Sequence, residues 1–224
     1  MDGFWGPLIL SARLAAVTTA ILLAGGLPLA YWLAFSRCRL RHFVHAAVSL
    51  PLVLPPTVLG FYLLLLLGPR GPAGRLCDAF GGPGLVFSFT GLVIGSVLFS
   101  LPFMVHPVEA ALSALPPSLA EAAAVLGKGR VETFRRVLLP NIRPAVLTGA
   151  VMTFAHTLGE FGVVLMLGGG IPGATRTASV AIYSEVEALS YGLAHRHALA
   201  LLLMTFPVLL GLRLLRPAAP GGRL

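Results

Sequence analysis

The sequence predicts an all-α membrane protein, a polytopic bundle of about five transmembrane helices. Hydrophobic residues make up 57% of the 224 residues and charged residues only 11%, and the mean hydropathy is +0.90. Soluble domains carry about 25% charged residues, so this composition argues against a soluble enzyme and against a disordered chain. Uninterrupted apolar runs such as residues 63–67 lack the alternation that a transmembrane β-strand requires.

Five apolar segments are each long enough to cross a hydrocarbon core of ~30 Å as a helix. In chain order they are Pro7–Phe35, Ala46–Leu67, Leu85–Val105, Ala145–Leu167 and Ala198–Leu215. We expect one transmembrane domain over residues 1–224, with its core at about residues 8–215. The Pro- and Gly-rich end, residues 216–224, is predicted to be a disordered tail.

The positive charges are distributed unevenly around these spans. Eleven of the 16 Lys and Arg residues fall on one side and four on the other. Because cytoplasmic loops are enriched in Lys and Arg, we expect the N-terminus outside the cytoplasmic membrane and the C-terminus inside. The basic residues lie in short runs between apolar stretches, so the net charge of +8 indicates a partner that is a lipid bilayer and not a nucleic acid.

The long cytoplasmic segment between the third and fourth spans contains a predicted helical hairpin. Ser118 precedes Glu121 by three residues, which is the spacing of an N-terminal capping box. An apolar stripe at helical spacing is formed by Leu119, Ala122, Ala123 and Leu126. Gly127 is placed to end this helix in the left-handed conformation. A second helical stretch, Arg130–Leu139, is predicted to end at Pro140.

The spacing of residues within this segment, 116–140, is more specific than its amphipathic pattern. The pattern E-A-A-x3-G-x9-V-x-L-P is formed by Glu121, Ala122, Ala123, Gly127, Val137, Leu139 and Pro140. It resembles the EAA loop of ABC importer permeases, where Ile stands in place of Val137. The resemblance implies a coupling helix that docks on a cytoplasmic ATPase subunit, with Ser118 and Leu126 in the same docking loop. The alternative is a hairpin that packs only on its own bundle.

Other stretches resemble the molybdate branch of these permeases. They are residues 50–60, and residues 158–162 followed by 171–177. The resemblance covers about residues 8–215 and is to the molybdate ABC transporter permease subunit, with a type I ABC importer permease-like fold. It implies an assembly of two permease subunits, two cytoplasmic ABC ATPase subunits and an external oxyanion-binding protein.

The energy source is expected to lie outside this chain. The sequence lacks the G-x-x-x-x-G-K-[ST] loop that cradles nucleotide phosphates. We therefore expect no cofactor in this chain, no catalytic residue and no metal, with ATP and Mg²⁺ bound by the partner ATPase. One five-helix chain is too small to enclose a polar path, so a two-fold homodimer of permease subunits is expected.

Several residues within the predicted spans are candidates for the translocation path. Prolines kink a helix, and broken helices in transporters often mark the substrate path. The candidates are Pro55, Pro56, Thr57, Gly60, Thr153, Thr157 and Glu160. An ordinary packing kink is the alternative for the prolines. His156 lies four residues before Glu160 and is one candidate partner. An ionised Glu160 would repel an oxyanion, which favours a structural hydrogen-bonding role for it.

Three other functions remain open at this point. The nearest is an importer permease of the same architecture for sulfate or tungstate. A proton-coupled secondary transporter would use His156 and Glu160 as a relay, and it would transport without ATP. A membrane-embedded enzyme ranks last, because the sequence lacks the H-E-x-x-H and G-x-S-x-G motifs and any cluster of metal ligands.

Overall fold

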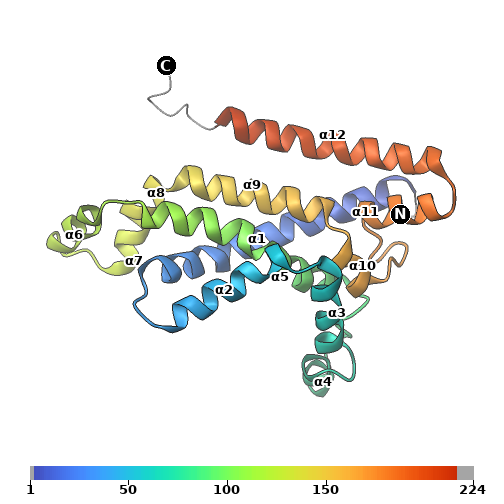
Figure 1. Cartoon of the computed structure of the whole chain (residues 1–224), viewed down its shortest axis with the longest axis horizontal. Helices are drawn as coiled ribbons and strands as arrows, with labels where there is room; N and C mark the ends of the chain where they lie inside the picture. Colours follow the sequence, from blue (N-terminus) through green and yellow to red (C-terminus); the bar gives the residue numbers. More distant parts are fainter. Residues whose placement is uncertain (1–2, 216–224) are drawn as a thin grey trace.

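The computed structural model describes residues 3–215, and within this range the chain is helical with no strand. This confirms the predicted all-α helix bundle (Figure 1). The elements are α1 (Trp5–Phe35), α2 (Leu40–Val53), α3 (Pro56–Leu67), α4 (Pro72–Ala79), α5 (Phe89–Ser113), α6 (Pro117–Val125), α7 (Arg130–Thr133), the π-helical turn η1 (Phe134–Leu138), α8 (Leu139–Asn141), α9 (Arg143–Gly159), α10 (Gly162–Gly168), α11 (Ala178–Glu187) and α12 (Tyr191–Leu215). The predicted tail, residues 216–224, lies outside the described residues.

The described helices supply between three and five membrane spans. By length and composition, α1, α5 and α12 can each cross a membrane alone. The number rises to five if each of two bent helix pairs counts as one span. The predicted number of spans therefore fits, but the second and fourth spans are broken and are not single helices.

The break in the second span follows from local sequence. The span bends by 118° between α2 and the α3–α4 segment. Proline lacks an N–H group and forces the preceding residue into an extended conformation, and Leu54 and Pro55 have ψ angles of 138° and 136°. As a result α3 and α4 project away from the long axis of the bundle (Figure 1). The second bent pair is the Arg130–Asn141 segment with α9, which meet at 78°. The predicted fourth span also breaks between α9 and α10, where Glu160 is extended with ψ 134°.

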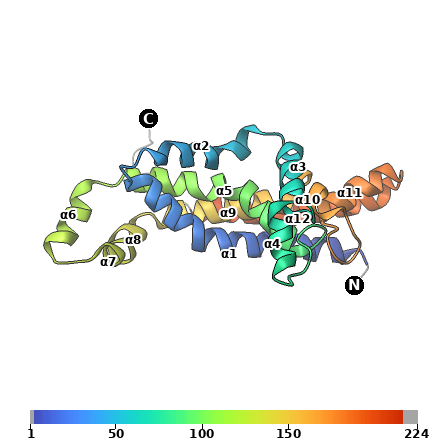
Figure 2. The same ribbon diagram turned by 90° about the horizontal axis from the view of Figure 1, so that it is seen from below.

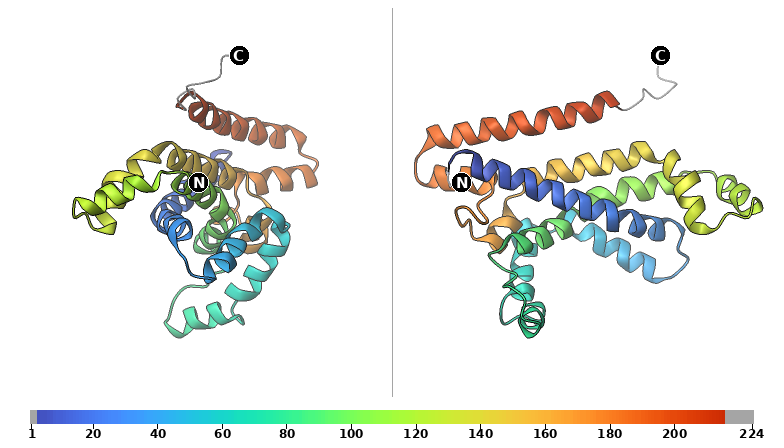
Figure 3. Two further views of the ribbon diagram at one scale, coloured as in Figure 1. Left: turned by 60° about the vertical axis from the view of Figure 1, so that its left-hand side comes forward. Right: turned by 180° about the vertical axis from the view of Figure 1, so that it is seen from behind.

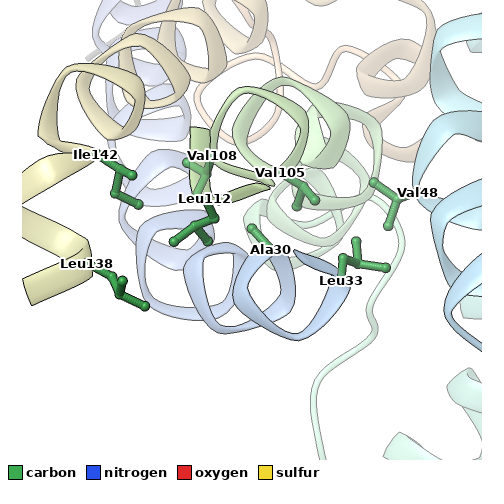
Figure 4. Close-up of a cluster of buried hydrophobic side chains, with 8 residues drawn as sticks. All are labelled: Ala30, Leu33, Val48, Val105, Val108, Leu112, Leu138 and Ile142. Atoms are coloured by element: carbon green, nitrogen blue, oxygen red, sulfur yellow. The ribbon is translucent and has the colours of Figure 1, made fainter. Parts of the chain in front are cut away.

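The centre of the bundle is formed by α1, α5 and α9, which pack on one another along much of their length. A buried apolar cluster joins α1, α2 and α5 to the end of the 116–140 loop (Figure 4). Its members are Ala30, Leu33, Val48, Val105, Val108, Leu112, Leu138 and Ile142. Since Leu138 and Ile142 belong to this cluster, the loop is anchored directly to the core of the bundle.

The last helix stands apart from this centre. Only 11% of the most apolar window of α12 is buried, and it runs beside the bundle (Figure 3). It begins at Tyr191, seven residues before the predicted start of the fifth span. Its exposed face carries Leu202, Leu203 and Phe206. In a membrane protein such a face contacts lipid or another subunit.

Candidate functional site

The 116–140 loop lies at one end of the bundle and projects beyond it (Figure 2). The same end carries the Arg-rich link between α1 and α2, whereas α11 and the first turn of α1 lie at the opposite end (Figure 1). The predicted helical hairpin is present as α6 followed by α7, η1 and α8. The geometry therefore presents the EAA pattern on a protruding structure and not on the side of the bundle.

The first helix of the loop ends as predicted but begins differently. Gly127 has a left-handed φ of +70°. The Gly127 and Lys128 N–H groups donate to the carbonyls of Ala124 and Ala123, which together make a Schellman motif. The predicted capping box is wrong, because α6 begins at Pro117 and no side chain caps it. Proline at the first helical position has a preset φ and needs no hydrogen-bond acceptor there, so Ser118 lies inside the helix.

The surface of the loop is strongly apolar. Val125, Leu126 and Val131 are 88%, 76% and 72% exposed. Glu121 and Ala122 are also exposed, whereas Ala123 is buried against the rest of the hairpin. The predicted apolar stripe is thus divided. Ala123 packs inside the hairpin, whereas Ala122 and Leu126 face solvent. Exposed apolar side chains grouped on a protrusion are typical of an interaction surface.

The second half of the loop connects this surface to the bundle. The helix does not end at Pro140 as predicted but continues to Asn141. A wider turn precedes the proline, in which the Leu139 N–H donates to the Phe134 carbonyl five residues back. Such a π-turn shifts the helix where proline cannot donate. Val137 and Leu139 are half-buried, beside the anchoring residue Leu138.

Charged residues stabilise the start of this second half. Glu132 accepts a hydrogen bond from Lys128 Nζ at 2.9 Å, and Arg136 Nη1 lies 3.1 Å from the same carboxylate oxygen. The Lys128 hydrogen bond, helped by the charges of Lys128 and Arg136, lowers the pKa of Glu132 below its usual value. Glu132 therefore loses its charge at a lower pH than an unperturbed glutamate does.

A polar cluster lies inside the bundle between α5 and α9 and consists of Ser96, Ser100, His156, Thr157 and Glu160. The Ser96 hydroxyl donates to Glu160 Oε2 at 2.8 Å. Ser100 Oγ lies 3.0 Å from His156 Nδ1 and 3.0 Å from Thr157 Oγ1. Glu160 is thus held by Ser96, and His156, the partner considered from the sequence, is bonded to Ser100.

Two groups near this cluster lack a partner. Glu160 Oε1 and Thr153 Oγ1 are buried and accept or donate no hydrogen bond within the described residues. Sequence reasoning missed Ser96 and Ser100, although the signal was present as two serines four residues apart in an apolar helix.

The predicted path residues do not form one surface. Thr153, Thr157 and Glu160 are buried between helices, whereas Pro55, Pro56 and Thr57 are exposed at the break between α2 and α3.

Gly60 is buried in helix packing and does not line an open path. A Cβ atom there would lie 2.9 Å from the Cβ of Met166 and 3.2 Å from the Cα of Val163. The absence of a side chain at Gly60 therefore lets α3 and α10 cross closely.

The two helix breaks nevertheless meet. A Cβ atom on Gly162 would lie 2.6 Å from the Cβ of Pro56 and 3.4 Å from the N atom of Thr57. The start of α10 thus packs on the start of α3, with Glu160 only two residues before the contact. Irregular backbone within a membrane is tolerated where it is covered by protein or lines a cavity, and here the start of α10 covers one side of the break between α2 and α3.

A cavity of about 220 Å³ opens at the end of the bundle opposite the 116–140 loop. It lies between the start of α1 and the loop after α10, and both Arg13 and Arg176 line it. The Arg13 guanidinium stacks 4.5 Å above the ring of Phe89. Arg176 lies 3.8 Å from Glu185. Two guanidinium groups therefore line this cavity, and one of them lies near the Glu185 carboxylate.

Comparisons with known proteins agree with these features. The family model described as "Binding-protein-dependent transport system inner membrane component" matches residues 26–219. The chain is 50% identical over 203 residues to the "Molybdenum transport system permease protein ModB" of Azotobacter vinelandii, covering 91% of this chain and 90% of that protein. It is 38% identical over 171 residues to the "Probable sulfate transport system permease protein cysT" of Chlorella vulgaris, covering 76% of this chain and 64% of that protein.

The fold has a solved counterpart. The chain aligns with a chain of a bacterial alginate ABC transporter crystallised with an alginate pentasaccharide-bound periplasmic protein, with a TM-score of 0.77 over 95% of this chain and 77% of that chain. At 18% identity this likeness concerns the fold, and it confirms the predicted importer-permease architecture. With the match over residues 26–219, the chain belongs to the family of binding-protein-dependent transport system inner membrane components.

Proposed function

We propose that this chain is the permease subunit of an ATP-driven importer that moves molybdate across the cytoplasmic membrane. The observation that carries the proposal is the 50% identity to a molybdenum permease over about nine tenths of both chains. The protruding apolar surface of the 116–140 loop supports it, because an importer driven by a separate ATPase needs a contact of this kind.

In this proposal the 116–140 loop docks on the ATPase. The docking loop comprises Ser118, Glu121, Ala122, Ala123, Leu126, Gly127, Val137, Leu139 and Pro140, with Ala123 buried inside the hairpin. The assembly contains two copies of this chain, two ATPase subunits that bind ATP and Mg²⁺, and an external oxyanion-binding protein. ATP shifts the populations of the outward and inward states because it binds one of them better. The loop transmits the motion to the bundle through Leu138 and Ile142, which lie in the buried core.

The substrate enters from the end that carries Arg13 and Arg176, where positive charge attracts an oxyanion. It then passes the region where the two broken helices meet. Pro55, Pro56 and Thr57 are exposed there, on the face that a second permease copy would complete. Thr157 and Glu160 stiffen the wall of this path, since they bond to Ser100 and Ser96 inside the bundle, and Thr153 is buried beside them.

Reconstitution tests the proposal directly. The permease, its ATPase and its binding protein are placed in liposomes, and molybdate uptake is measured with and without ATP on the ATPase side. We expect ATP-dependent uptake that is lost in Leu126→Asp, because a charge on the apolar docking surface opposes burial against the ATPase. Leu189→Asp is the matched control, since Leu189 is 73% exposed and lies at the opposite end.

The outcomes separate the classes of transporter. Uptake without ATP that follows a proton gradient would rule out the coupling role of the loop and favour the proton-coupled alternative. Equal loss of uptake in Leu126→Asp and Leu189→Asp would indicate general damage and contradict a specific docking surface.

The sulfate permease of Chlorella vulgaris, at 38% identity, makes sulfate the second candidate substrate. We expect molybdate uptake to be inhibited weakly by excess sulfate and strongly by unlabelled molybdate. Stronger inhibition by sulfate would assign the transporter to sulfate.

A further inference from the structure

Three metal-ligating side chains meet between α2 and α5, away from the features described above. They are His45 on α2 and His106 and Glu109 on α5. One nitrogen of each histidine and one carboxylate oxygen all lie within 4.8 Å of one another. His45 Nε2 is 3.4 Å from Glu109 Oε2, and His106 Nδ1 is 3.9 Å from the same oxygen. The cluster lies at the same end of the bundle as the 116–140 loop.

Ser49 of α2 contacts His106. The Ser49 hydroxyl donates to the His45 carbonyl at 2.9 Å, and Ser49 Oγ is also 3.2 Å from His106 Nε2. With its hydrogen on the His45 carbonyl, Ser49 accepts from His106 Nε2–H. In that tautomer of the neutral ring, Nδ1 presents a lone pair toward Glu109.

His106 and Glu109 then offer lone pairs to the same position. His106 Nδ1 lies 3.9 Å from Glu109 Oε2, too far for a hydrogen bond between them. Glu109 is only 8% exposed, and a buried carboxylate is costly without a compensating partner. Arg41 lies 4.0 Å from the opposite oxygen, Oε1. A cation bound at Oε2 would compensate the buried charge there.

We propose that this position binds a divalent transition metal of the zinc class, ligated by His45 Nε2, His106 Nδ1 and Glu109 Oε2. Two histidines and one glutamate, with a fourth position open to water, form a known zinc donor set. One metal satisfies all three groups, whereas one proton on His106 satisfies only one contact. A proton on each ring would place two cations together, because the ring centroids are 5.2 Å apart.

The distances fit this ligand set with small movements. Zinc–ligand bonds of about 2.0–2.2 Å in a tetrahedron place ligand atoms roughly 3.4 Å apart. The contact between His45 and Glu109 already has this length at 3.4 Å. The His45 side chain is 47% exposed, which leaves room for it to turn toward His106. Ser49 then acts as the outer partner that orients His106, as hydrogen-bonded groups do around many metal-bound histidines.

A bound metal would clamp the start of α2 to the end of α5. Val48 of α2 already packs with Val105 and Val108 of α5 in the apolar cluster beside it (Figure 4). The metal therefore adds a second attachment for α2 on this side of the break at Pro55. The consequence is greater stability of the α2–α5 contact when the metal is present.

Metal binding is tested on the full-length permease purified in detergent without a polyhistidine tag. The probe is Zn²⁺ alone, with bound metal measured by mass spectrometry after dialysis and affinity measured by competition with a chromophoric chelator. We expect one Zn²⁺ per chain and a higher Tm when Zn²⁺ is added. His106→Asn and Glu109→Gln are expected to abolish both effects, and His45→Asn to weaken binding strongly.

Two further variants keep the test specific. Ser49→Ala is expected to weaken Zn²⁺ binding by about 10–100-fold, because it removes the group that orients His106. His42→Asn is the matched control: His42 lies on the same helix, is exposed and is outside the cluster, so binding is expected to be unchanged. Absence of stoichiometric Zn²⁺, or its retention in both His106→Asn and Glu109→Gln, would overturn the proposal, as would equal loss in His42→Asn.

Discussion

A single backbone angle at Gly127 decides how the first helix of the 116–140 loop ends. The φ of +70° is unfavourable for any residue with a Cβ atom by about 1–2 kcal/mol. A Cβ atom at Gly127 would meet nothing within 4 Å, so only the backbone conformation is affected. A substitution at Gly127 therefore changes the energy of the backbone conformation without changing side-chain packing.

We expect Gly127→Ala to weaken binding of the purified ATPase to the solubilised permease by about tenfold, since the docked loop must adopt the strained conformation. Gly129→Ala is the control, because Gly129 also faces open space but has a φ of −69°. Binding is measured by biolayer interferometry. Equal effects of the two substitutions would show that the left-handed angle is unimportant for docking.

The hydrogen bond between Ser96 and Glu160 is the second feature at the scale of one residue. Ser96→Ala leaves both oxygens of a buried carboxyl group without a protein partner, and we expect a loss of about 1–3 kcal/mol in the free energy of unfolding. Ser113→Ala is the control, an exposed serine at the end of the same helix. Thermal unfolding in detergent measures both variants. A Ser96→Ala protein as stable as Ser113→Ala would mean that water replaces the lost bond.

The crossing of α3 and α10 is the feature that matters most at the scale of helices. Gly159 and Gly162 flank the break between α9 and α10, but their surroundings differ. A Cβ atom at Gly162 would collide with Pro56 at 2.6 Å, whereas one at Gly159 would meet nothing within 4 Å. The two glycines therefore form a matched pair that separates packing from helix propensity.

We expect Gly162→Ala to destabilise the protein by about 1–3 kcal/mol through overpacking. Gly159→Ala is expected to be neutral or to stabilise by up to about 1 kcal/mol, because alanine restricts the unfolded chain. The measurement is the unfolding free energy in mixed micelles. A tolerated Gly162→Ala together with a damaging Gly159→Ala would contradict the contact between the two breaks.

The orientation of the whole molecule in the membrane follows from charge and is open to a direct test. Cys38 is free and exposed in the Arg-rich link between α1 and α2, at the end that we assign to the cytoplasm. Ala174 is exposed in the loop after α10, at the opposite end. A membrane-impermeant maleimide distinguishes the two positions.

In spheroplasts we expect the reagent to label Ala174→Cys, made in a Cys38→Ser, Cys77→Ser background, without detergent. Cys38 in a Cys77→Ser variant is expected to react only after detergent opens the membrane. The reverse pattern would place the 116–140 loop outside, where it has no access to an ATPase.

Much of the fold is predictable from the sequence because its causes are local. Apolar length determines the spans, prolines determine the break at Pro55, and Gly127 determines the end of α6. The capping box at Ser118 failed for an equally local reason: Pro117 offers an alternative helix start with its φ already fixed. The end predicted at Pro140 failed because a wider turn accommodates the proline.

What the sequence by itself determined is thus the class of the protein: the helices, their approximate number, and the loop whose spacing identifies the family. Only the tertiary structure decided which polar groups meet. Ser96 and Glu160 are 64 residues apart in the chain, and His45 lies on a different helix from Glu109. Hydropathy and helix propensity act over a few neighbouring residues, whereas these contacts depend on how α2, α5 and α9 pack. The partner of Glu160, the burial of Gly60 and the His45–His106–Glu109 cluster therefore emerge only in three dimensions.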